Sequence, residues 1–424
     1  MKVTDRQYAL RLDAADPLAI YRERFVINNP DLCYLDGNSL GRLPKATIGV
    51  VQEYLLKEWG PKLVNGWAEW IDEAEVTGDL IGRAALGAAP GQVLACDTTS
   101  VNFYQLVGAA IAARPGRKTI ITDKGNFPTD RYILQGLARI HNLNLIEIDN
   151  EAGSSATHER ITPEILEPYL SEDVAFITFE VIQYRSGARN DIQALTELAR
   201  RYGALAIWDA SHAVGALSLD VDLNNVDLMV GCTYKYGNSG PGSPAWLYIS
   251  HRLQGELRTP IQGWFAQRNQ FAMGEFFEKN DGIRGFQIAS PSIIGLRCIN
   301  SAFGMIEEAT IQAIEAKCAI GTEMMISLYD AWLAELGFTL NTPRKSKERG
   351  GHISLSHPDA KRISIALRQI CNVIPDYREP NSIRLAISPL PCSYVEVWDG
   401  LDRLRQLTES RRFEEILNTD VKVS

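Results

Sequence analysis

Two charged residues each follow a mostly apolar segment of the chain. Asp209 comes directly after the run 204–208, and Lys235 lies just beyond the run 226–232. Both runs are typical of short buried parallel strands, whose carboxyl ends open into the crevice where α/β folds bind ligands. We therefore expect the carboxylate and the amine to reach one site from the same edge of a sheet.

This pair of groups could bind pyridoxal phosphate. The cofactor withdraws electrons while its ring nitrogen is cationic, which requires an ionised carboxylate in a mostly desolvated pocket, and its aldehyde requires an amine. Alone, an aspartate after a strand is most often a turn or cap residue, and a lysine between tyrosines is most often a solvated charge. Together with His212, Tyr234 and the turn 237–242, Asp209 and Lys235 favour the cofactor site.

A phosphate could bind where Thr99 and Ser100 precede the helical run 103–113. Backbone N–H groups and small hydroxyls at a helix N-terminus bind phosphate well. Plain N-capping by Thr99 or Ser100 is the alternative. A cofactor that carries a phosphate favours the binding interpretation.

Phe127 lies in the segment 126–130, where a strand is expected to pass into a helix. Its face could cover a planar ring by offset stacking. A core phenylalanine followed by a proline turn explains the segment equally well, so the sequence leaves both interpretations open.

Arg384 is flanked by apolar residues in the segment 382–389, which implies partial burial and a partner. A planar guanidinium suits a carboxylate bidentately. The carboxylate could belong to an amino-acid substrate or to an internal Asp or Glu, and spacing does not separate the two. Tyr184, in the segment 184–187 after the strand that ends at Phe179, adds a phenol on the crevice side.

Apolar runs alternate with helical patterns over roughly residues 80–260, which indicates parallel strands joined by crossover helices. The expected fold is α/β, with a mostly parallel central sheet flanked by helices and a smaller α+β C-terminal domain. We predict strands at 119–122, 143–148, 174–179, 205–208, 228–231 and 245–249, and helices at 130–141 and 191–202. After Pro291 we predict a long helical stretch to Leu336.

The length of the chain and the change in its sequence pattern suggest how it is divided into domains. The 424 residues exceed what one hydrophobic core usually holds. We predict an N-terminal segment, 1–45, that packs with the small domain, a large cofactor-binding domain, 46–295, and a small C-terminal domain, 296–424.

Composition limits the partners and the compartment. A net charge of −9 and a sequence pI near 5.4 argue against nucleic acid or an anionic membrane as the main partner. No stretch approaches the ~18 apolar residues of a membrane span, and no apolar signal core is present at the N-terminus. Seven cysteines and six histidines show no paired or metal-type spacing. We expect a cytoplasmic protein without a metal site.

The chain resembles the kynureninases, which are fold-type I, class V aminotransferase-like enzymes that use pyridoxal phosphate. The resemblance spans nearly the whole chain, and several motifs are specific to kynureninases. The motifs are Tyr34-Leu-Asp-Gly-Asn-Ser-Leu-Gly41, Trp59-Gly60, Phe127-Pro-Thr-Asp130, Tyr184-Arg-Ser-Gly187, Asp209-Ala-Ser-His-Ala-Val-Gly215, Tyr234-Lys-Tyr236, Gly263-Trp-Phe265, Gly285-Phe286 and Arg384.

The resemblance implies a role for each matching residue. Lys235 would be the Schiff-base lysine, Asp209 the partner of the ring nitrogen and His212 a contact beside the ring. The remaining cofactor contacts would be a stacked ring from Phe127, an orienting carboxyl from Asp130 and phosphate ligands from Thr99, Ser100, Tyr234 and Trp264. Trp264 is expected from the second subunit of a homodimer with the active site at the interface. The substrate side would include Arg384, bound to the α-carboxylate, with Tyr184, Gln267 and Ser290.

This chain departs from the family pattern in a few places. Kynureninases commonly read Gly-Trp-Phe-Gly-His where this chain has Gly263-Trp-Phe-Ala-Gln267, and the animal enzymes read Arg-Ile-Ser-Asn-Pro where it has Gln287-Ile-Ala-Ser-Pro291. Both segments lie around the aryl-ketone end of the substrate, so they bear on substrate choice rather than on cofactor chemistry. Glu180 stands where the animal enzyme has a smaller polar residue.

The resemblance implies cleavage of an L-α-amino acid at the β-carbon, as in the hydrolysis of L-kynurenine to anthranilate and L-alanine. Lys235, freed by the substrate amine, would remove the α-proton, and Tyr234 would relay a proton. The same cofactor also permits a carbon–sulfur β-lyase or a decarboxylating deaminase of an S-substituted cysteine, or a class V aminotransferase-like enzyme. A catalytically silent homologue would be expected to lack the lysine or the aspartate, and both are present.

Overall fold

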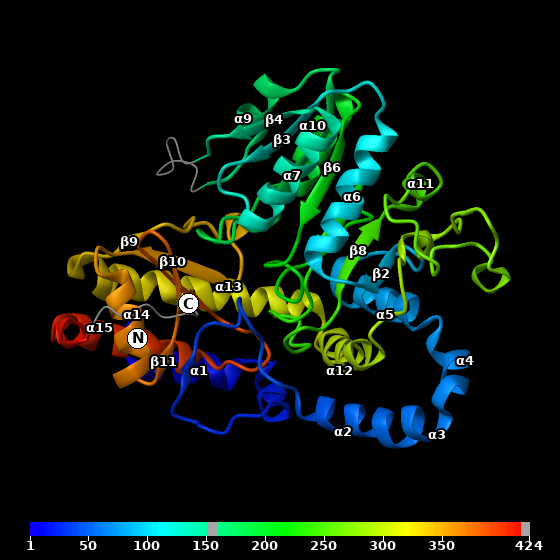
Figure 1. Cartoon of the computed structure of the whole chain (residues 1–424). Helices are drawn as coiled ribbons and strands as arrows, with labels where there is room; N and C mark the ends of the chain where they lie inside the picture. Colours follow the sequence, from blue (N-terminus) through cyan, green and yellow to red (C-terminus); the bar gives the residue numbers. More distant parts are fainter. Residues whose placement is uncertain (151–158, 417–424) are drawn as a thin grey trace.

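The computed structural model describes residues 1–150 and 159–416, and within these residues seven strands form the sheet of the larger lobe (Figure 1). The order is β2-β8-β7-β6-β5-β3-β4, and β8 alone runs antiparallel to its neighbours. The strands are β2 (Val93–Cys96), β3 (Thr119–Asp123), β4 (Asn144–Ile148), β5 (Val174–Glu180), β6 (Leu205–Asp209), β7 (Leu228–Gly231) and β8 (Ala245–Ile249). The prediction of a mostly parallel central sheet is confirmed.

All six strands that the sequence predicts are present, with their ends within one residue of the prediction. The strand β2 was not predicted, because a short apolar run does not show which element it belongs to. Every residue of β5 and β6 is buried, as expected of parallel strands that are covered on both faces.

Helices cover the sheet and lengthen the molecule below it (Figure 1). The helices α6, α7 and α10 pack near the sheet, and α2 to α4 form an extended arm. The helices of the larger lobe and the arm are α2 (Lys45–Glu53), α3 (Gly60–Lys62), α4 (Trp67–Trp70), α5 (Glu73–Ile81), α6 (Thr99–Ala113), α7 (Pro128–His141), α9 (Pro163–Leu166), α10 (Ile192–Arg201), α11 (His251–Gln254) and α12 (Ile293–Ala309).

The smaller lobe contains an antiparallel sheet of order β12-β13-β10-β9 and a short β1-β11 pair among the described residues. The N-terminal helix packs here, since Asp13 accepts from the backbone N–H of Tyr394 at 2.6 Å. Its elements are α1 (Arg6–Ala15), β1 (Cys33–Tyr34), α13 (Ile311–Leu328), β9 (Thr339–Leu340), β10 (His352–Ser356), α14 (Ala360–Ile370), β11 (Val373–Ile374), β12 (Asp376–Arg378), β13 (Ser382–Ala386) and α15 (Tyr394–Glu409).

The predicted helical stretch after Pro291 is broken into α12 and α13. Thr310 lies between them with φ +65° and caps α13, since its side chain accepts from the backbone N–H of Ala313. The buried side chains of α12 belong to the core of the larger lobe, and those from Met324 onward belong to the second core. The domain boundary that we place at 295 to 296 stays a prediction.

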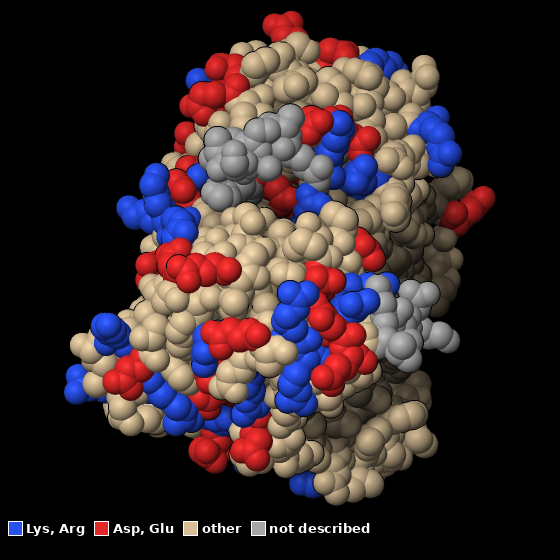
Figure 2. All heavy atoms as spheres, turned by 90° about the vertical axis from the view of Figure 1, so that its left-hand side faces the viewer, with Lys and Arg blue, Asp and Glu red and all other residues tan. Residues whose placement is uncertain are grey.

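The surface carries charges of both signs side by side on the face drawn in Figure 2. Across residues 1–150 and 159–416, none of the helices has the length and apolarity needed to cross a bilayer.

Candidate active site

The structure brings Asp209, Lys235 and His212 together at the carboxyl edge of the larger sheet. Asp209 ends β6 and is buried, and the backbone N–H of Ser211 donates to its Oδ1 at 2.6 Å. Lys235 follows β7, and its Nζ lies 3.2 Å from His212 Nε2 and 5.9 Å from the centre of the Phe127 ring. The two strands therefore deliver the amine and the carboxylate to one edge, as the sequence predicts.

His212 is a neutral side chain in this setting. Burial, with Lys235 and Arg384 nearby, lowers its pKa well below the usual value for histidine. Its ring lies 5.8 Å from the ring of His352, a second buried imidazole whose pKa is also lowered by burial. The sequence analysis missed His352, because β10 reaches the site only through long-range pairing.

Three further carboxyl groups gather around Asp209, and we call these four residues the acid side: Asp123, Asp130, Glu180 and Asp209. Burial raises the pKa of Asp123 to about 7. Burial and the neighbouring Asp209 raise the pKa of Asp130 and of Glu180 well above their usual values. The protons on these groups limit the negative charge that the site must hold.

A pattern in the sequence indicates this cluster. The strands β3, β5 and β6 each end on an acidic residue after an apolar run, namely Asp123, Glu180 and Asp209. Because these three parallel strands are neighbours, their final side chains lie at one edge of the sheet.

Arginines gather on the opposite side of the site, within β12, β13 and α14. Arg384 is fully buried, donates through Nε and Nη2 to Asp376 and through Nη1 to the carbonyl of Tyr184, and lies 3.4 Å from His212 Nε2. We call the group the arginine side: Arg368, Arg378 and Arg384, with Asp36 and Asp376.

The internal carboxylate that the sequence left open as a partner for Arg384 is Asp376. Arg378 Nε donates to the same carboxylate at 3.0 Å, and Arg384 Nη2 also donates to Ser39 Oγ at 3.2 Å. Arg384 and Lys235 both lie close to His212 Nε2, so Arg384 is nevertheless near Lys235. Its assignment to a substrate carboxylate stays a prediction.

The expected phosphate cradle lies at the N-terminus of α6. Thr98 caps this helix, since its Oγ1 accepts from the N–H of Val101 at 3.3 Å. Capping by Thr99 or Ser100, the alternative interpretation, is therefore wrong, and both residues lie in the first turn with their hydroxyls left for other partners. The Cys232 thiol and partial burial raise the pKa of the Tyr234 phenol, which favours its protonated form.

Phe127 precedes Pro128, the first residue of α7, and is only half-buried. Its ring meets the ring of Tyr184 edge to face, with centroids 5.4 Å apart and planes at 87°. Both rings line a cavity of about 420 Å³ together with Arg368 and Arg378. The ring of Phe127 thus faces the site rather than the core of the lobe.

Three predicted site residues lie in the segment 263–290, which projects from the larger lobe beyond α11 (Figure 1). Trp264 is 44% exposed, and its ring contacts within the described residues are Phe265 and Phe271. Gln267 accepts from the N–H of Glu278 at 2.6 Å, so it holds a local hairpin. Ser290 is exposed. The structure does not bring these residues to Lys235 of the same chain.

The side chains at the sheet edge fit pyridoxal phosphate. Lys235 offers an amine beside the face of Phe127, and the acid side offers the buried carboxyl group of Asp209, with Asp130 next to it. A cationic ring nitrogen would satisfy such a group. The first turn of α6 offers free N–H groups for a phosphate.

Known proteins resemble this chain in both sequence and fold. The family model described as "Kynureninase C-terminal domain" matches residues 314–404. A kynureninase of Pseudomonas fluorescens is 34% identical over 419 residues, which cover 96% of this chain and 97% of that protein.

Among solved structures, the apo cysteine desulfurase of Thermococcus onnurineus NA1 matches with a TM-score of 0.78 at 17% identity, over 92% of this chain and 98% of that one. A mutant of C-DES with glycine covalently linked to its PLP cofactor matches with a TM-score of 0.76 at 15% identity, over 91% and 98%. At these identities the two structures show the fold, which is that of the fold-type I enzymes.

Proposed function

Because the chain belongs to the kynureninase family, we propose that it is a pyridoxal-phosphate-dependent hydrolase that cleaves L-kynurenine at the β-carbon to give anthranilate and L-alanine. The observation that carries the proposal is the meeting of Lys235 and Asp209 at one sheet edge, with buried Arg384 alongside. An amine, a carboxylate and a guanidinium are the groups that the cofactor aldehyde, its ring nitrogen and an α-carboxylate require.

When bound, pyridoxal phosphate supplies an aldehyde that links to amines and a cationic ring that withdraws electrons. Lys235 would hold this aldehyde and, as a free amine, would take and return the proton at the α-carbon. Asp209 keeps the proton on the ring nitrogen. His212 is neutral, so it contacts the ring without adding a charge.

The remaining predicted contacts complete this proposal. Thr99, Ser100 and Tyr234 hold the phosphate, and Phe127 covers the face of the ring. Arg384 binds the substrate α-carboxylate together with Tyr184. The raised pKa of Tyr234 keeps the proton on its phenol at neutral pH, so the group is present beside the phosphate in its protonated form.

A homodimer with the active site at its interface is part of the proposal. Large apolar side chains are exposed in the projecting segment and in the α2 to α4 arm, which is typical of an interaction surface. They include Leu56, Trp59, Leu63, Val64, Phe271, Met273 and Phe276. Trp264 would extend from this surface to the phosphate of the partner subunit.

Complementation tests the shared site. Lys235→Ala and Trp264→Ala chains, each nearly inactive alone, are mixed and allowed to exchange subunits. A mixed dimer has one site with both Lys235 and Trp264 intact, so activity should reappear after mixing. A mixture that stays as inactive as its components, although light scattering shows dimers that exchange, would contradict the shared site.

Substrate choice is tested directly on the cofactor-loaded enzyme. Incubation with L-kynurenine, 3-hydroxykynurenine and S-substituted cysteines is followed by anthranilate fluorescence and by assays for alanine, pyruvate and thiol. Anthranilate and alanine in equal amounts are expected. The altered residues Gln267, Gln287 and Ser290 are compatible with a second candidate, a carbon–sulfur β-lyase, and pyruvate with thiol but no anthranilate would select it.

A cytoplasmic location also belongs to the proposal. All seven cysteines are unpaired, and five of them are buried. Free thiols suit a reducing compartment. Thiol counting after rapid alkylation of the protein in cells should give seven, and disulfide-bonded protein would argue against this location.

A further inference from the structure

Glu180 belongs to the acid side but has a second connection within the site. It ends β5 directly beside Asp209 in the sheet register and is 2% exposed. Its Oε2 accepts from the backbone N–H of Tyr184 at 3.0 Å. The carboxyl group thus satisfies an amide of the turn that follows the strand.

The turn from Val181 to Asn190 closes on the end of β5. The Asn190 backbone N–H donates to Val181 at 2.9 Å, and its side chain donates to the Glu180 carbonyl at 2.8 Å. Gly187 has φ +75°, and a Cβ there would lie 2.7 Å from the carbonyl oxygen of His352. The turn therefore has little space in which to change shape.

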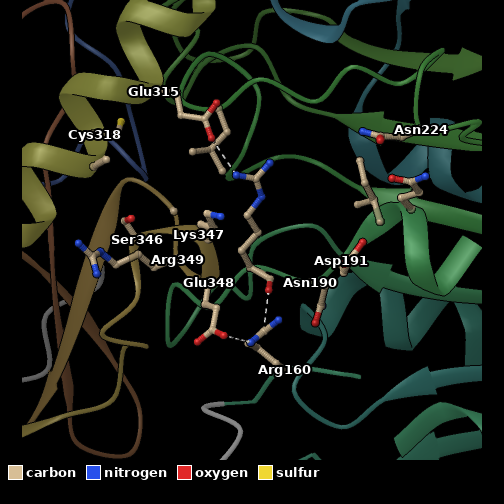
Figure 3. A pocket seen from close by; sticks show the side chains of 16 residues that line it. Arg160, Asn190, Asp191, Asn224, Glu315, Cys318, Ser346, Lys347, Glu348 and Arg349 are labelled. Atoms are coloured by element: carbon tan, nitrogen blue, oxygen red, sulfur yellow. Dashed lines mark hydrogen bonds and ion pairs between the residues drawn. The ribbon is translucent and has the colours of Figure 1, made fainter. Parts of the chain in front are cut away.

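The back of the turn is fixed separately, at a second cavity of about 520 Å³ (Figure 3). Arg160 Nε donates to the Arg189 carbonyl at 2.9 Å, and Arg160 Nη1 pairs with Glu348 at 3.0 Å. Arg189 in turn pairs with Glu315 at 2.8 Å. These charges partner one another and hold the back of the turn, whereas Glu180 holds the Tyr184 amide at the front.

Tyr184 connects the turn to both functional parts of the site. Its ring packs edge to face on Phe127, and its carbonyl accepts from Arg384 Nη1. The N–H that Glu180 holds and the carbonyl that orients the guanidinium therefore belong to one residue, on its two adjacent peptide groups.

We infer that Glu180 is a positioning residue for carboxylate recognition: its hydrogen bond to the Tyr184 amide sets the carbonyl that aims Arg384 at the substrate α-carboxylate. The inference rests on the proposed function, because it assigns a carboxylate to Arg384. It gives a role to a position at which this chain departs from the animal enzyme.

The carboxyl group performs this role without a charge. Asp209 on β6, Asp123 on β3 and Asp130 on α7 face it, and burial together with Asp209 raises its pKa well above the usual value. A protonated acid keeps one carbonyl oxygen for the Tyr184 amide, and so does the amide of glutamine. Glutamine at position 180 should therefore keep the hydrogen bond to the Tyr184 amide, whereas alanine or leucine should lose it.

The test uses cofactor-loaded enzyme and two small ligands, L-alanine and L-alaninamide, which differ only in the carboxylate. Binding is followed by the absorbance change of the bound cofactor. E180A and E180L should each weaken L-alanine binding about tenfold and L-alaninamide binding less than twofold, and E180Q should restore the parent values. T178V is the matched control, because Thr178 is buried two residues earlier on β5 and its hydroxyl has no partner in the described residues.

Coupling to Arg384 gives the second readout. R384K should also weaken L-alanine binding selectively, and E180L/R384K should be no weaker than R384K alone, because both act on one contact. The inference would be overturned if E180L weakened the binding of both ligands equally, or if the losses of affinity were additive in the double variant. It would also be overturned if E180Q bound L-alanine as weakly as E180L does. These measurements do not use kynurenine, so a parent enzyme inactive on kynurenine would overturn the proposed function and leave this test intact.

Discussion

The acid side and the arginine side of the site differ in how they hold buried charge. The acid side reduces its charge, since burial raises the pKa of three of its four carboxyl groups. The arginine side cannot reduce its charge in this way, because a guanidinium stays protonated, and it supplies an internal counterion instead. Asp376 serves Arg384 and Arg378 together.

The difference teaches how each side is suited to its ligand. A cationic ring nitrogen brings a positive charge to the acid side, whose negative charge is otherwise limited only by the protons on Asp123, Asp130 and Glu180. Under the proposed function, a substrate carboxylate would share Arg384 with Asp376. We therefore expect the acid side to control cofactor binding and the arginine side to control KM.

The largest effect should come from the amine beside the acid side. In the proposed mechanism Lys235 links the cofactor and moves the α-proton, so Lys235→Ala should lower kcat by about 10³-fold or more. Activity and the absorbance of the lysine-linked cofactor check this. Lys118→Ala, at an exposed lysine of the same lobe, is the control. A Lys235→Ala enzyme with the parent spectrum would remove the basis for the cofactor assignment.

The arginine side should respond mainly in KM. Arg384→Lys loses the planar fork, so KM for the substrate should rise about 10- to 100-fold with a smaller change in kcat. Arg378→Lys is the matched variant, because it shares Asp376 but its side chain is 30% exposed. Steady-state kinetics should show less than a threefold change for it, and equal effects of the two variants would erase the distinction between them.

The acid side should also be visible in stability. Asp123 has a folded-state pKa of about 7, above the unfolded value, so the folded chain holds an extra proton between about pH 4 and 7 and loses stability as pH rises through that range. Asp123→Asn removes the titration and should stabilise the cofactor-free chain at pH 8 by about 1 to 3 kcal/mol relative to the parent.

Urea unfolding at pH 4 and pH 8 measures this difference. Asp173→Asn is the control of opposite sign, because a hydrogen bond from Thr119 lowers the pKa of Asp173 and its contribution is present at neutral pH and lost in acid. If the free energy of unfolding changed with pH in the same way in the parent and in Asp123→Asn, Asp123 would already be ionised in the folded chain over this range.

The smallest effect should come from Asp36. Burial, with Asp376 nearby, raises its pKa to about 6. Ionisation above that pH adds a negative charge near Arg384, so KM should rise a few-fold between pH 5 and 7.5. In Asp36→Asn, KM should not change with pH over this range. If KM still rises with pH in the variant, another group causes the rise.

The sequence predicts the larger lobe well because its signals are local. Apolar runs give β3 to β8, and the acid after the run 204–208 identifies Asp209. The capping of α6 was less predictable, since Thr98, Thr99 and Ser100 are all good N-caps. Only the backbone conformation of Thr98, φ −117° and ψ 160°, separates them.

The arginine side was predictable in part. The apolar neighbours of Arg384 imply burial, but its partner Asp376 is opposite it in the β12–β13 register, and a register is not readable from one chain. Trp264 shows another limit. Its motif indicates a cofactor contact, although within the described residues of its own chain the ring contacts Phe265 and Phe271.

Helix α13 runs from one lobe into the other (Figure 1). Its first half supplies Ile311 and Ile314 to one hydrophobic core, and its second half supplies Met325 and Leu328 to the other. If either core unfolds, one half of this helix loses its packing contacts. Heating should therefore give a single cooperative endotherm in calorimetry instead of two separate steps.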